Sequence, residues 1–331
     1  MLKQLFDVAL PYLLGGIAVG GQYALIAIGY TMVYGILRLI NFAHGDIFMV
    51  AGLIMVYSNT AITPILISCG IAASSAFIIS IILSVIIVLV LTVALGLAVE
   101  AAAYRPLRNA PRMSVMISAI GVSYLIQNCA IYITGGLAQP YPAKGESIPW
   151  LSDSIKIGTA SVKRVTIITP FLTIALVVLL VFLIQKTKIG MAMRAVSKDF
   201  ETSRLMGIKV DNVISTTFLI GSFLAAAGSI LYFTNYASVV PTSGAMPGLK
   251  AFVAAVFGGI GSIPGAVVGA FIIGICENIL KGLDNILKTM GLINENFGFA
   301  TFSDAFTFVL LIIILCVKPT GLFSEKNTDK V

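Results

Sequence analysis

The amino-acid sequence predicts an all-α integral membrane protein with about eight transmembrane helices, and three observations carry that prediction. Of the 331 residues, 58% are hydrophobic and only 11% are charged, whereas soluble domains carry about 25% charged residues. The apolar stretches are continuous rather than alternating, which favours helices because backbone groups in lipid must be satisfied internally. Glycines break one apolar stretch, 251–280, which predicts a broken, partly re-entrant element. We interpret residues 1–331 as a single transmembrane domain.

Composition also limits the functions that the chain can have. The sequence contains no G-x-x-x-x-G-K-[ST] phosphate loop, and with His44 as its one histidine it shows no catalytic set. Its four cysteines lie in apolar segments without metal-ligand spacing. The net charge of +7 is explained by Lys and Arg on the cytoplasmic side of a membrane. We therefore expect no enzyme activity and no cofactor, metal or nucleic-acid partner. We expect membrane lipid to surround the chain.

Charge-free runs of about 20 residues mark the expected spans. These spans cover residues 8–37, 44–58, 65–97, 113–134, 167–185, 213–236, 251–280 and 301–317. Residues 58–60 with Pro64 supply the expected turn between the second and third spans. The third span is over-long, so we expect it to tilt or kink.

Basic residues between the spans predict which side each loop faces. Residues 100–112 and 186–211 are basic and are expected in the cytoplasm. The polar loop 135–166 is expected outside, although it also contains Lys and Arg, because it must alternate with the two denser basic loops. A single crossing by 251–280 would place the basic tail outside, so we favour an element that dips and returns or forms two short pieces.

The loop from Gln185 to Asn212 holds six of the 21 Lys and Arg residues, including Arg194. Residues 191–206 contain no Gly or Pro and predict a short helix, which Gly207 would end. Such a loop can serve topology alone. However, the order Glu201-Thr202-Ser203, three residues, then Gly207 resembles the E-A-A-x-x-x-G loop of bacterial ABC importer permeases, with Thr202 and Ser203 in place of two alanines. In that family the loop docks into the ATPase subunit.

Two polar groups interrupt the apolar segments. Asn41 and His44 precede the second span, where either one can cap a helix whose first turn holds Asp46, or where they can form a polar hinge at a gate. Gln127 and Asn128 in the fourth span can line a path or bond to neighbouring helices.

The glycine-rich break can likewise serve packing or line the path for substrate. Its candidate residues are Gly258, Gly259, Gly261 and Pro264. We place Glu277, further along this element, at the membrane interface. No span shows a buried run of charges, which argues against an ion-coupled pump. Glycine backbone and hydroxyl groups along a path suit a small substrate that is neutral overall or apolar.

Three blocks together resemble the branched-chain amino-acid ABC importer permeases, specifically the LivH-type subunit. They read QYALIAIGYTMVYGILRLINFAHGDIFMVAG, GMAMRAVSKDFETSRLMGI and GGIGSIPGAVVGA, and the similarity extends from about residue 10 to 322. The resemblance implies a multi-pass protein of the bacterial inner membrane that imports leucine, isoleucine and valine. It also implies a second homologous permease, two ABC ATPase subunits and a periplasmic or lipid-anchored solute-binding protein as partners. Urea or short-chain amide permeases are the nearest alternative, and a stand-alone channel or carrier is a more distant one.

Overall fold

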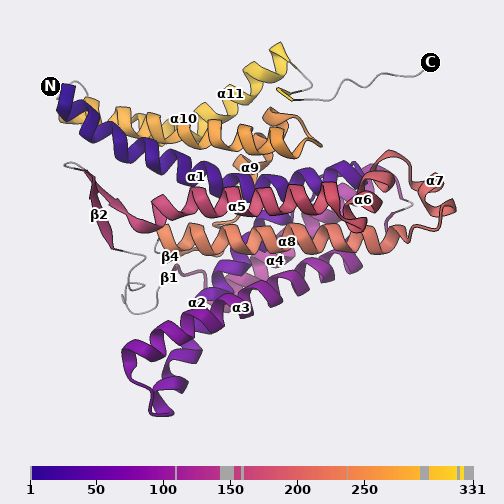
Figure 1. Cartoon of the computed structure of the whole chain (residues 1–331), viewed down its shortest axis with the longest axis horizontal. Helices are drawn as coiled ribbons and strands as arrows, with labels where there is room; N and C mark the ends of the chain where they lie inside the picture. Colours follow the sequence, from indigo (N-terminus) through magenta and orange to yellow (C-terminus); the bar gives the residue numbers. More distant parts are fainter. Residues whose placement is uncertain are drawn as a thin grey trace.

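The computed structural model describes residues 2–108, 110–141, 153–157, 160–236, 238–290, 298–318 and 321–323. These residues form a helical bundle with a few short strands (Figure 1). The α-helices are α1 (Leu2–Leu37), α2 (His44–Ser68), α3 (Ala73–Val99), α4 (Arg112–Thr134), α5 (Arg164–Lys186), α6 (Lys188–Lys198), α7 (Phe200–Leu205), α8 (Val210–Asn235), α9 (Ala245–Gly258), α10 (Ile263–Thr289) and α11 (Ser303–Val317). A π-helical turn, η1 (Glu100–Tyr104), extends α3, and a 3₁₀ turn, η3 (Phe299–Phe302), precedes α11.

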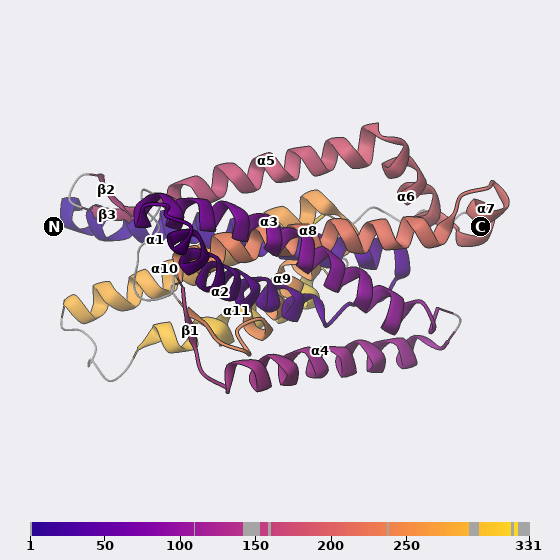
Figure 2. The same ribbon diagram turned by 90° about the horizontal axis from the view of Figure 1, so that it is seen from below.

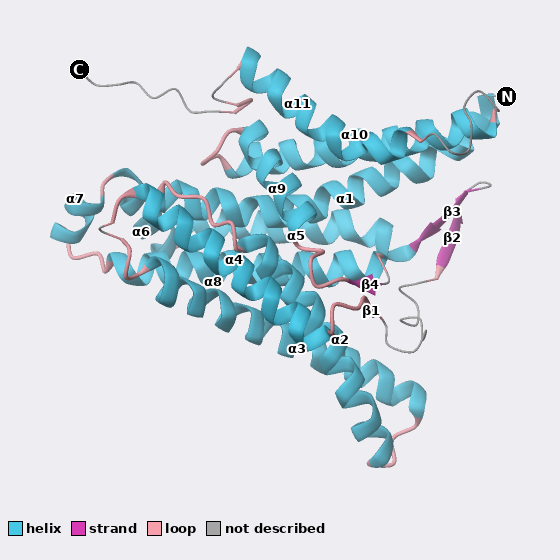
Figure 3. Cartoon of the chain, turned by 180° about the vertical axis from the view of Figure 1, so that it is seen from behind, coloured by secondary structure: helices cyan, strands magenta, loops and turns pink. Residues whose placement is uncertain are grey.

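Seven of the described helices are long and apolar enough to cross a membrane, and α9 and α11 are shorter apolar helices. The prediction of about eight spans in an all-α membrane protein is thereby confirmed. The short strands are β1 (Gln139–Pro140), β2 (Ser154–Ile157), β3 (Ala160–Lys163) and β4 (Ser238–Val239). They form two antiparallel pairs, β1 with β4 and β2 with β3. Figure 3 shows these strands on the side of the molecule where the N-terminus lies.

Helix α1 forms the centre of the bundle and packs against α10, α8, α9 and α5. Small residues allow the closest of these contacts. A Cβ atom at Gly20 would lie 2.8 Å from the Cα atom of Phe271, and one at Gly274 would lie 2.3 Å from the backbone nitrogen of Gly20. Gly16 makes a similar approach one turn earlier. Membrane helices associate through such small-residue contacts because lipid supplies no hydrophobic drive between them.

Helices α4 and α5 lie on opposite sides of the bundle (Figure 2). Both expose large apolar side chains, among them Leu125 on α4 and Phe171 on α5. In water such surfaces would be costly, so lipid or another membrane subunit must cover them.

The two ends of the bundle differ. The N-terminus and the β2–β3 hairpin lie at one end, whereas α6 and α7 lie at the other (Figure 1). The described parts of loop 135–166 and loop 186–211 therefore occupy opposite ends, as their expected outer and cytoplasmic sides require. Residues 142–152 and 158–159 of the outer loop lie outside the described residues.

The predicted turn at residues 58–60 is wrong, because α2 continues through Pro64 to Ser68. Thr60 and Thr63 donate hydrogen bonds to the carbonyls of Val56 and Asn59, four residues earlier. These bonds hold the helix together around the proline, which membrane helices tolerate. The chain turns instead at Gly70, whose φ is +86°. Helix α3 consequently starts at Ala73. Together with η1 it forms a span of 32 residues, Ala73–Tyr104, so the third span is over-long as predicted but begins and ends later in the sequence.

The segment 251–280 is divided between two helices, in agreement with the predicted break. Helix α9 ends at Gly258 and α10 begins at Ile263. After α11, the chain returns to this break, where the backbone N–H groups of Leu322 and Phe323 donate to the carbonyls of Phe257 and Gly258. Residues 321–323 thus lie beside the α9–α10 turn and satisfy carbonyls that the end of α9 leaves free.

Candidate functional site

Loop 186–211 folds into two helices rather than the single helix that its sequence predicts. Helix α6 begins after Thr187, whose side chain accepts a hydrogen bond from the backbone N–H of Gly190. The chain then bends at Asp199, which has extended dihedral angles (φ −155°, ψ +117°). The Asp199 carboxylate accepts from the backbone N–H groups of Glu201 and Thr202, at 2.9 and 3.2 Å. This local cap competes with helix continuation and starts α7.

Gly207 ends α7 in the manner the sequence predicts. Its φ is +82°, a left-handed conformation that glycine adopts without a Cβ penalty. The N–H of Ile208 donates to the carbonyl of Ser203, and the N–H of Gly207 donates to that of Arg204. Together these bonds form a Schellman motif. A Cβ atom at Gly207 would meet nothing within 4 Å, so the position faces open space.

Helix α7 presents an apolar tip at this end of the bundle. Leu205 is 87% exposed and Met206 is 78% exposed. Glu201 and Thr202 are also exposed, whereas Ser203 is buried. Outside a membrane, large exposed apolar side chains are typical of a docking surface. We call the exposed residues of α7 together with Met206 and Gly207 the α7 tip.

Arg194, in contrast, points away from the α7 tip. Its guanidinium donates to the carbonyl of Ile184 near the end of α5. Gly190 packs closely on the same carbonyl, since a Cβ atom there would lie 2.1 Å from it. Arg194 therefore fixes α6 to α5.

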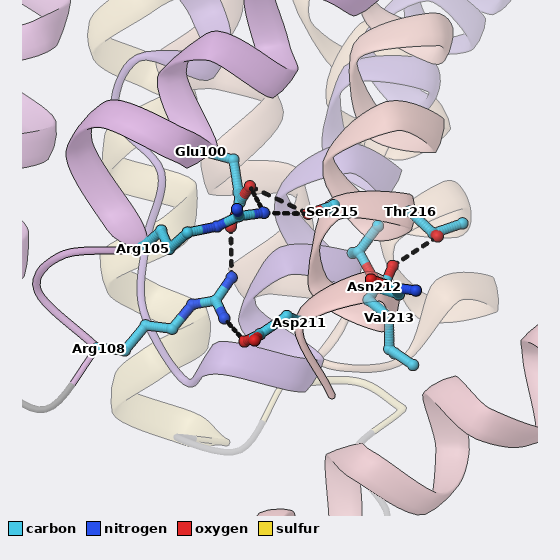
Figure 4. A network of polar contacts seen from close by, with 9 residues as sticks. Glu100, Arg105, Arg108, Asp211, Asn212, Val213, Ser215 and Thr216 are labelled. Carbon is cyan, nitrogen blue, oxygen red and sulfur yellow. Dashed lines mark hydrogen bonds and ion pairs between the residues drawn. The ribbon is translucent and has the colours of Figure 1, made fainter. Parts of the chain in front are cut away.

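A polar network connects the basic loop after α3 to the first turns of α8 (Figure 4). Glu100 is only 1% exposed and pairs with the guanidinium groups of Arg105 and Arg108. Arg108 also contacts Asp211, and Ser215 donates to Glu100 at 3.1 Å. Since α8 directly follows loop 186–211, this network ties that loop to the end of α3. It lies at the π-helical turn η1, and such turns are frequent at functional sites.

The prediction that Asn41 or His44 caps α2 through its side chain is wrong. The residue at the cap position is Ala43, and no side chain caps the helix. Asn41 instead accepts a hydrogen bond from the Tyr104 hydroxyl at 2.8 Å. The His44 ring is 2% exposed and fills a notch in α1, where a Cβ atom on Gly29 would lie 2.1 Å from Nε2. The gate function that the sequence suggests for these two residues stays a prediction.

Asp46 follows in the first turn of α2 and faces α4. Its carboxylate accepts from the Ser123 hydroxyl at 2.5 Å and from the Gln127 amide at 2.9 Å. These residues border a cavity of about 320 Å³. Among the described residues, Asn128 bonds to its own helix through the Tyr124 carbonyl, and it is exposed. Gln127 therefore borders this cavity and Asn128 does not.

The glycine-rich break forms a tight helix–turn–helix. Gly259 and Gly261 have φ of +107° and +101°. Ser262 then caps α10 by accepting from the N–H of Gly265, and Pro264 occupies the first turn of α10. A Cβ atom at Gly258 would lie 2.0 Å from the carbonyl oxygen of Gly265. Close backbone packing accounts for Gly258, and the positive φ angles account for Gly259 and Gly261. A function beside the substrate path stays a prediction.

A second polar cluster lies inside the bundle, which corrects the interfacial placement of Glu277. This residue lies in the middle of α10 and is 3% exposed. It pairs with Lys250 of α9 at 2.9 Å and with Lys281 at 2.6 Å, and it accepts from the Tyr23 hydroxyl of α1. The structure thus buries single charges of two helices against each other, which the absence of a run of charges within one span does not exclude. One lysine and one glutamate in neighbouring apolar segments were the signal that could have revealed this pair.

The long apolar helices, the exposed apolar faces and the polar groups between them define a multi-pass membrane protein with the features of a transport subunit. Residues 12–315 match the family described as the permease component of the branched-chain amino acid transport system. The chain belongs to this family, which confirms the resemblance to LivH-type permeases and the prediction of a transport subunit that is not itself an ATPase. Family membership implies ATPase and binding-protein partners.

The similarity to individual relatives extends over the full chain. The high-affinity branched-chain amino acid transport system permease protein LivH of Salmonella typhimurium is 37% identical over 100% of both chains. The corresponding protein BraD of Pseudomonas aeruginosa is 37% identical over 97% of this chain and 98% of the relative. The xylose transport system permease XylH of Escherichia coli is 30% identical over only 35% of this chain and 31% of its own. The solved structure of PsaBC from Streptococcus pneumoniae aligns over 97% of both chains with 13% identity and a TM-score of 0.45, a similarity too low to carry an argument.

Proposed function

We propose that this chain is the conducting permease of a bacterial inner-membrane ABC importer for leucine, isoleucine and valine. The observation that carries the proposal is the 37% identity to LivH over the full length of both chains. A substrate-conducting subunit also fits the open cavity of about 320 Å³ between α1, α2, α4 and α9, which the buried carboxylate of Asp46 borders.

The partners that we propose are a second homologous permease, two ABC ATPases and a periplasmic or lipid-anchored solute-binding protein. The α7 tip is the proposed docking site for an ATPase, because Leu205 and Met206 expose large apolar surfaces there. Arg194 and the Glu100 network connect the loop to α5 and to the end of α3. A force on the α7 tip would in this way act on several spans together.

Uptake of labelled leucine and labelled urea, in cells with and without the gene, tests the substrate. We expect deletion to abolish high-affinity leucine uptake and to leave urea uptake unchanged. Loss of urea uptake alone would overturn the proposed substrate but leave the proposed transport mechanism unchanged.

Affinity purification of the chain tests the partners. We expect an ATPase and a second permease to co-purify in stoichiometric amounts. A chain that purifies alone and still conducts substrate would be a channel or carrier, and would overturn the proposal. A charge introduced into the apolar α7 tip, Leu205→Asp, should release the ATPase, whereas Leu125→Asn on the exposed face of α4 serves as a control for a changed apolar surface elsewhere.

A further inference from the structure

Asp46 differs from the other buried carboxylates of the chain. Four carboxylates are buried in the described residues, namely those of Asp46, Glu100, Glu277 and Asp284. Glu100 pairs with two arginines, Glu277 with two lysines and Asp284 with Lys288. Within the described ranges, Asp46 makes no ion pair and receives only the neutral donors of Ser123 and Gln127.

An unpaired carboxylate is an expensive way to join two helices. Taking a charge out of water without a counter-ion costs far more than burying a hydrogen-bonded neutral group. An asparagine at position 46 could bond to the same two side chains of α4 without that cost. The N-terminal end of α2, where Asp46 occupies the first turn, offsets at most about 2 kcal/mol of this cost. The charge of Asp46 therefore indicates a positive group that joins it from outside the chain.

The space next to Asp46 can receive such a group. The cavity of about 320 Å³ lies between α1, the start of α2, α4 and the start of α9, and its volume is within the range of small-molecule sites. Its polar wall consists of Asp46, Ser123 and Gln127. The remaining lining is glycine backbone and apolar or aromatic surface. Its apolar part includes Phe42, Ile120, Leu249 and Phe252.

The two helix starts at this cavity complement the charge of Asp46. Helix α2 begins at His44 and α9 begins at Ala245, and their first turns meet because Gly45 packs directly on the carbonyl of Gly244. Helix N-termini carry partial positive charge, and interrupted membrane helices direct such ends at anionic groups of substrates. One negative side chain, two positive helix ends and apolar walls together suit a zwitterion with an apolar side chain.

We propose that this cavity binds the transported amino acid, with Asp46 receiving its α-ammonium group. Ser123 and Gln127 hold the carboxylate of Asp46 in place. Phe42, Ile120, Leu249 and Phe252 enclose the apolar side chain of the substrate. This inference rests on the proposed function, and it adds a substrate site within this chain. Urea carries no ammonium group, so it would leave the carboxylate of Asp46 without a counter-ion.

The first experiment compares Asp46→Asn with Asn128→Ala in the assembled transporter. Asn128 lies on the same helix as Gln127 but bonds to its own helix, so its variant is the matched control. We expect Asp46→Asn to lower leucine uptake at least about tenfold at unchanged complex levels, because a charge-assisted bond is lost, and Asn128→Ala to keep wild-type uptake. Wild-type uptake in Asp46→Asn would overturn the site while leaving the proposed function intact. If the wild-type transporter fails to import leucine, the proposed function itself is wrong.

A second experiment tests recognition of the ammonium group without altering Asp46. Ile120→Cys is introduced into the transporter after the four native cysteines have been replaced by serine, and its modification by a small thiol reagent is timed. We expect leucine to slow the reaction and 4-methylpentanoate, which has the same side chain without the ammonium, to leave it unchanged. Equal protection by both compounds, or by neither, would overturn the proposal. Adding Asp46→Asn to this background should raise the half-protecting leucine concentration at least about tenfold.

Discussion

Lys250 of α9 and Glu277 of α10 form an ion pair inside the bundle, with 2.9 Å between Nζ and Oε1. Their side chains are 6% and 3% exposed. Lys250 also pairs with Asp304 of α11 at 2.5 Å, and Glu277 also pairs with Lys281 at 2.6 Å. The two positive and two negative charges balance. The cluster joins the short helices α9 and α11 to the long helix α10, so it fixes the broken part of the fold.

Replacing Lys250 by methionine should destabilise the protein. Methionine keeps much of the side-chain volume but leaves the cluster with one excess negative charge. Breaking a buried pair costs about 3–5 kcal/mol, and we expect a smaller loss of about 1–3 kcal/mol because Glu277 keeps Lys281 and Asp304 is 44% exposed. Thermal unfolding of the purified permease measures the loss.

A compensating substitution separates charge from packing in this cluster. The double variant Lys250→Met/Asp304→Asn restores charge balance, since Glu277 and Lys281 then remain as a pair. We expect it to be more stable than Lys250→Met alone. A double variant that is less stable than either single variant would show that lost packing, and not the excess charge, causes the defect.

Within the Glu100 network, Glu100 should contribute more to stability than Asp211. Glu100→Gln removes the acceptor that two arginines share and should cost about 1–3 kcal/mol, less than a fully buried pair, because the Arg105 side chain is 52% exposed. Asp211→Asn is the control, since its side chain is 64% exposed and surface pairs contribute less than about 1 kcal/mol. Unfolding temperatures of the two variants should therefore separate clearly, and equal values would contradict the network.

Hydropathy and charge were sufficient to predict most spans, because lipid imposes length and apolarity on each of them. Helices α4, α5 and α8 begin and end within about three residues of their predicted bounds. The turn before α3 could not be located in this way. Both Pro64 and Gly70 are plausible breakers, and the decision depends on whether threonine hydroxyls bridge the helix around the proline, which only the structure shows.

The candidate site was predicted less completely, because the sequence shows which residues are polar but not which meet. Gln127 and Asp46 are 81 positions apart and share a hydrogen bond. The position of Arg194 in the sequence places it in the coupling loop, yet its side chain bonds back to α5. One lysine at the edge of an apolar segment usually reaches the interface, so the sequence does not indicate that Lys250 is buried.

Asp199 should control the start of α7 in a pH-dependent way. The Thr202 hydroxyl and the backbone N–H groups of Thr202 and Glu201 hold the pKa of Asp199 below its usual value. Because the folded pKa is lowered, the cap stabilises α7 at and above the unfolded pKa and is lost as the pH falls through the folded value. Asp199→Ala should therefore speed amide hydrogen exchange in residues 200–206 several-fold at neutral pH, and Asp199→Ser, which keeps a cap, should not.

Gly207 should tolerate asparagine and reject valine. The left-handed conformation at φ +82° costs a residue with a Cβ atom roughly 1–2 kcal/mol, and asparagine is less disfavoured there than a β-branched residue. We expect Gly207→Val to reduce both leucine uptake and substrate-stimulated ATPase activity, and Gly207→Asn to keep most of both. Because a Cβ atom at this site meets nothing within 4 Å, full activity of Gly207→Val at normal complex levels would show that the geometry of the α7 tip does not matter for coupling.

Because Gly29 contacts His44, alanine should destabilise the protein at position 29 of α1 but not at position 35. Gly29→Ala would place its Cβ atom 2.1 Å from Nε2 of His44, and overpacking of this kind costs about 1–3 kcal/mol. Gly35→Ala is the matched control, because a Cβ atom there meets nothing within 4 Å and alanine favours the helix by roughly 0.5–1 kcal/mol. Adding His44→Ala should make Gly29→Ala less harmful, so the two losses in unfolding free energy should sum to more than the double variant shows. Strictly additive losses would mean that the imidazole does not occupy the notch.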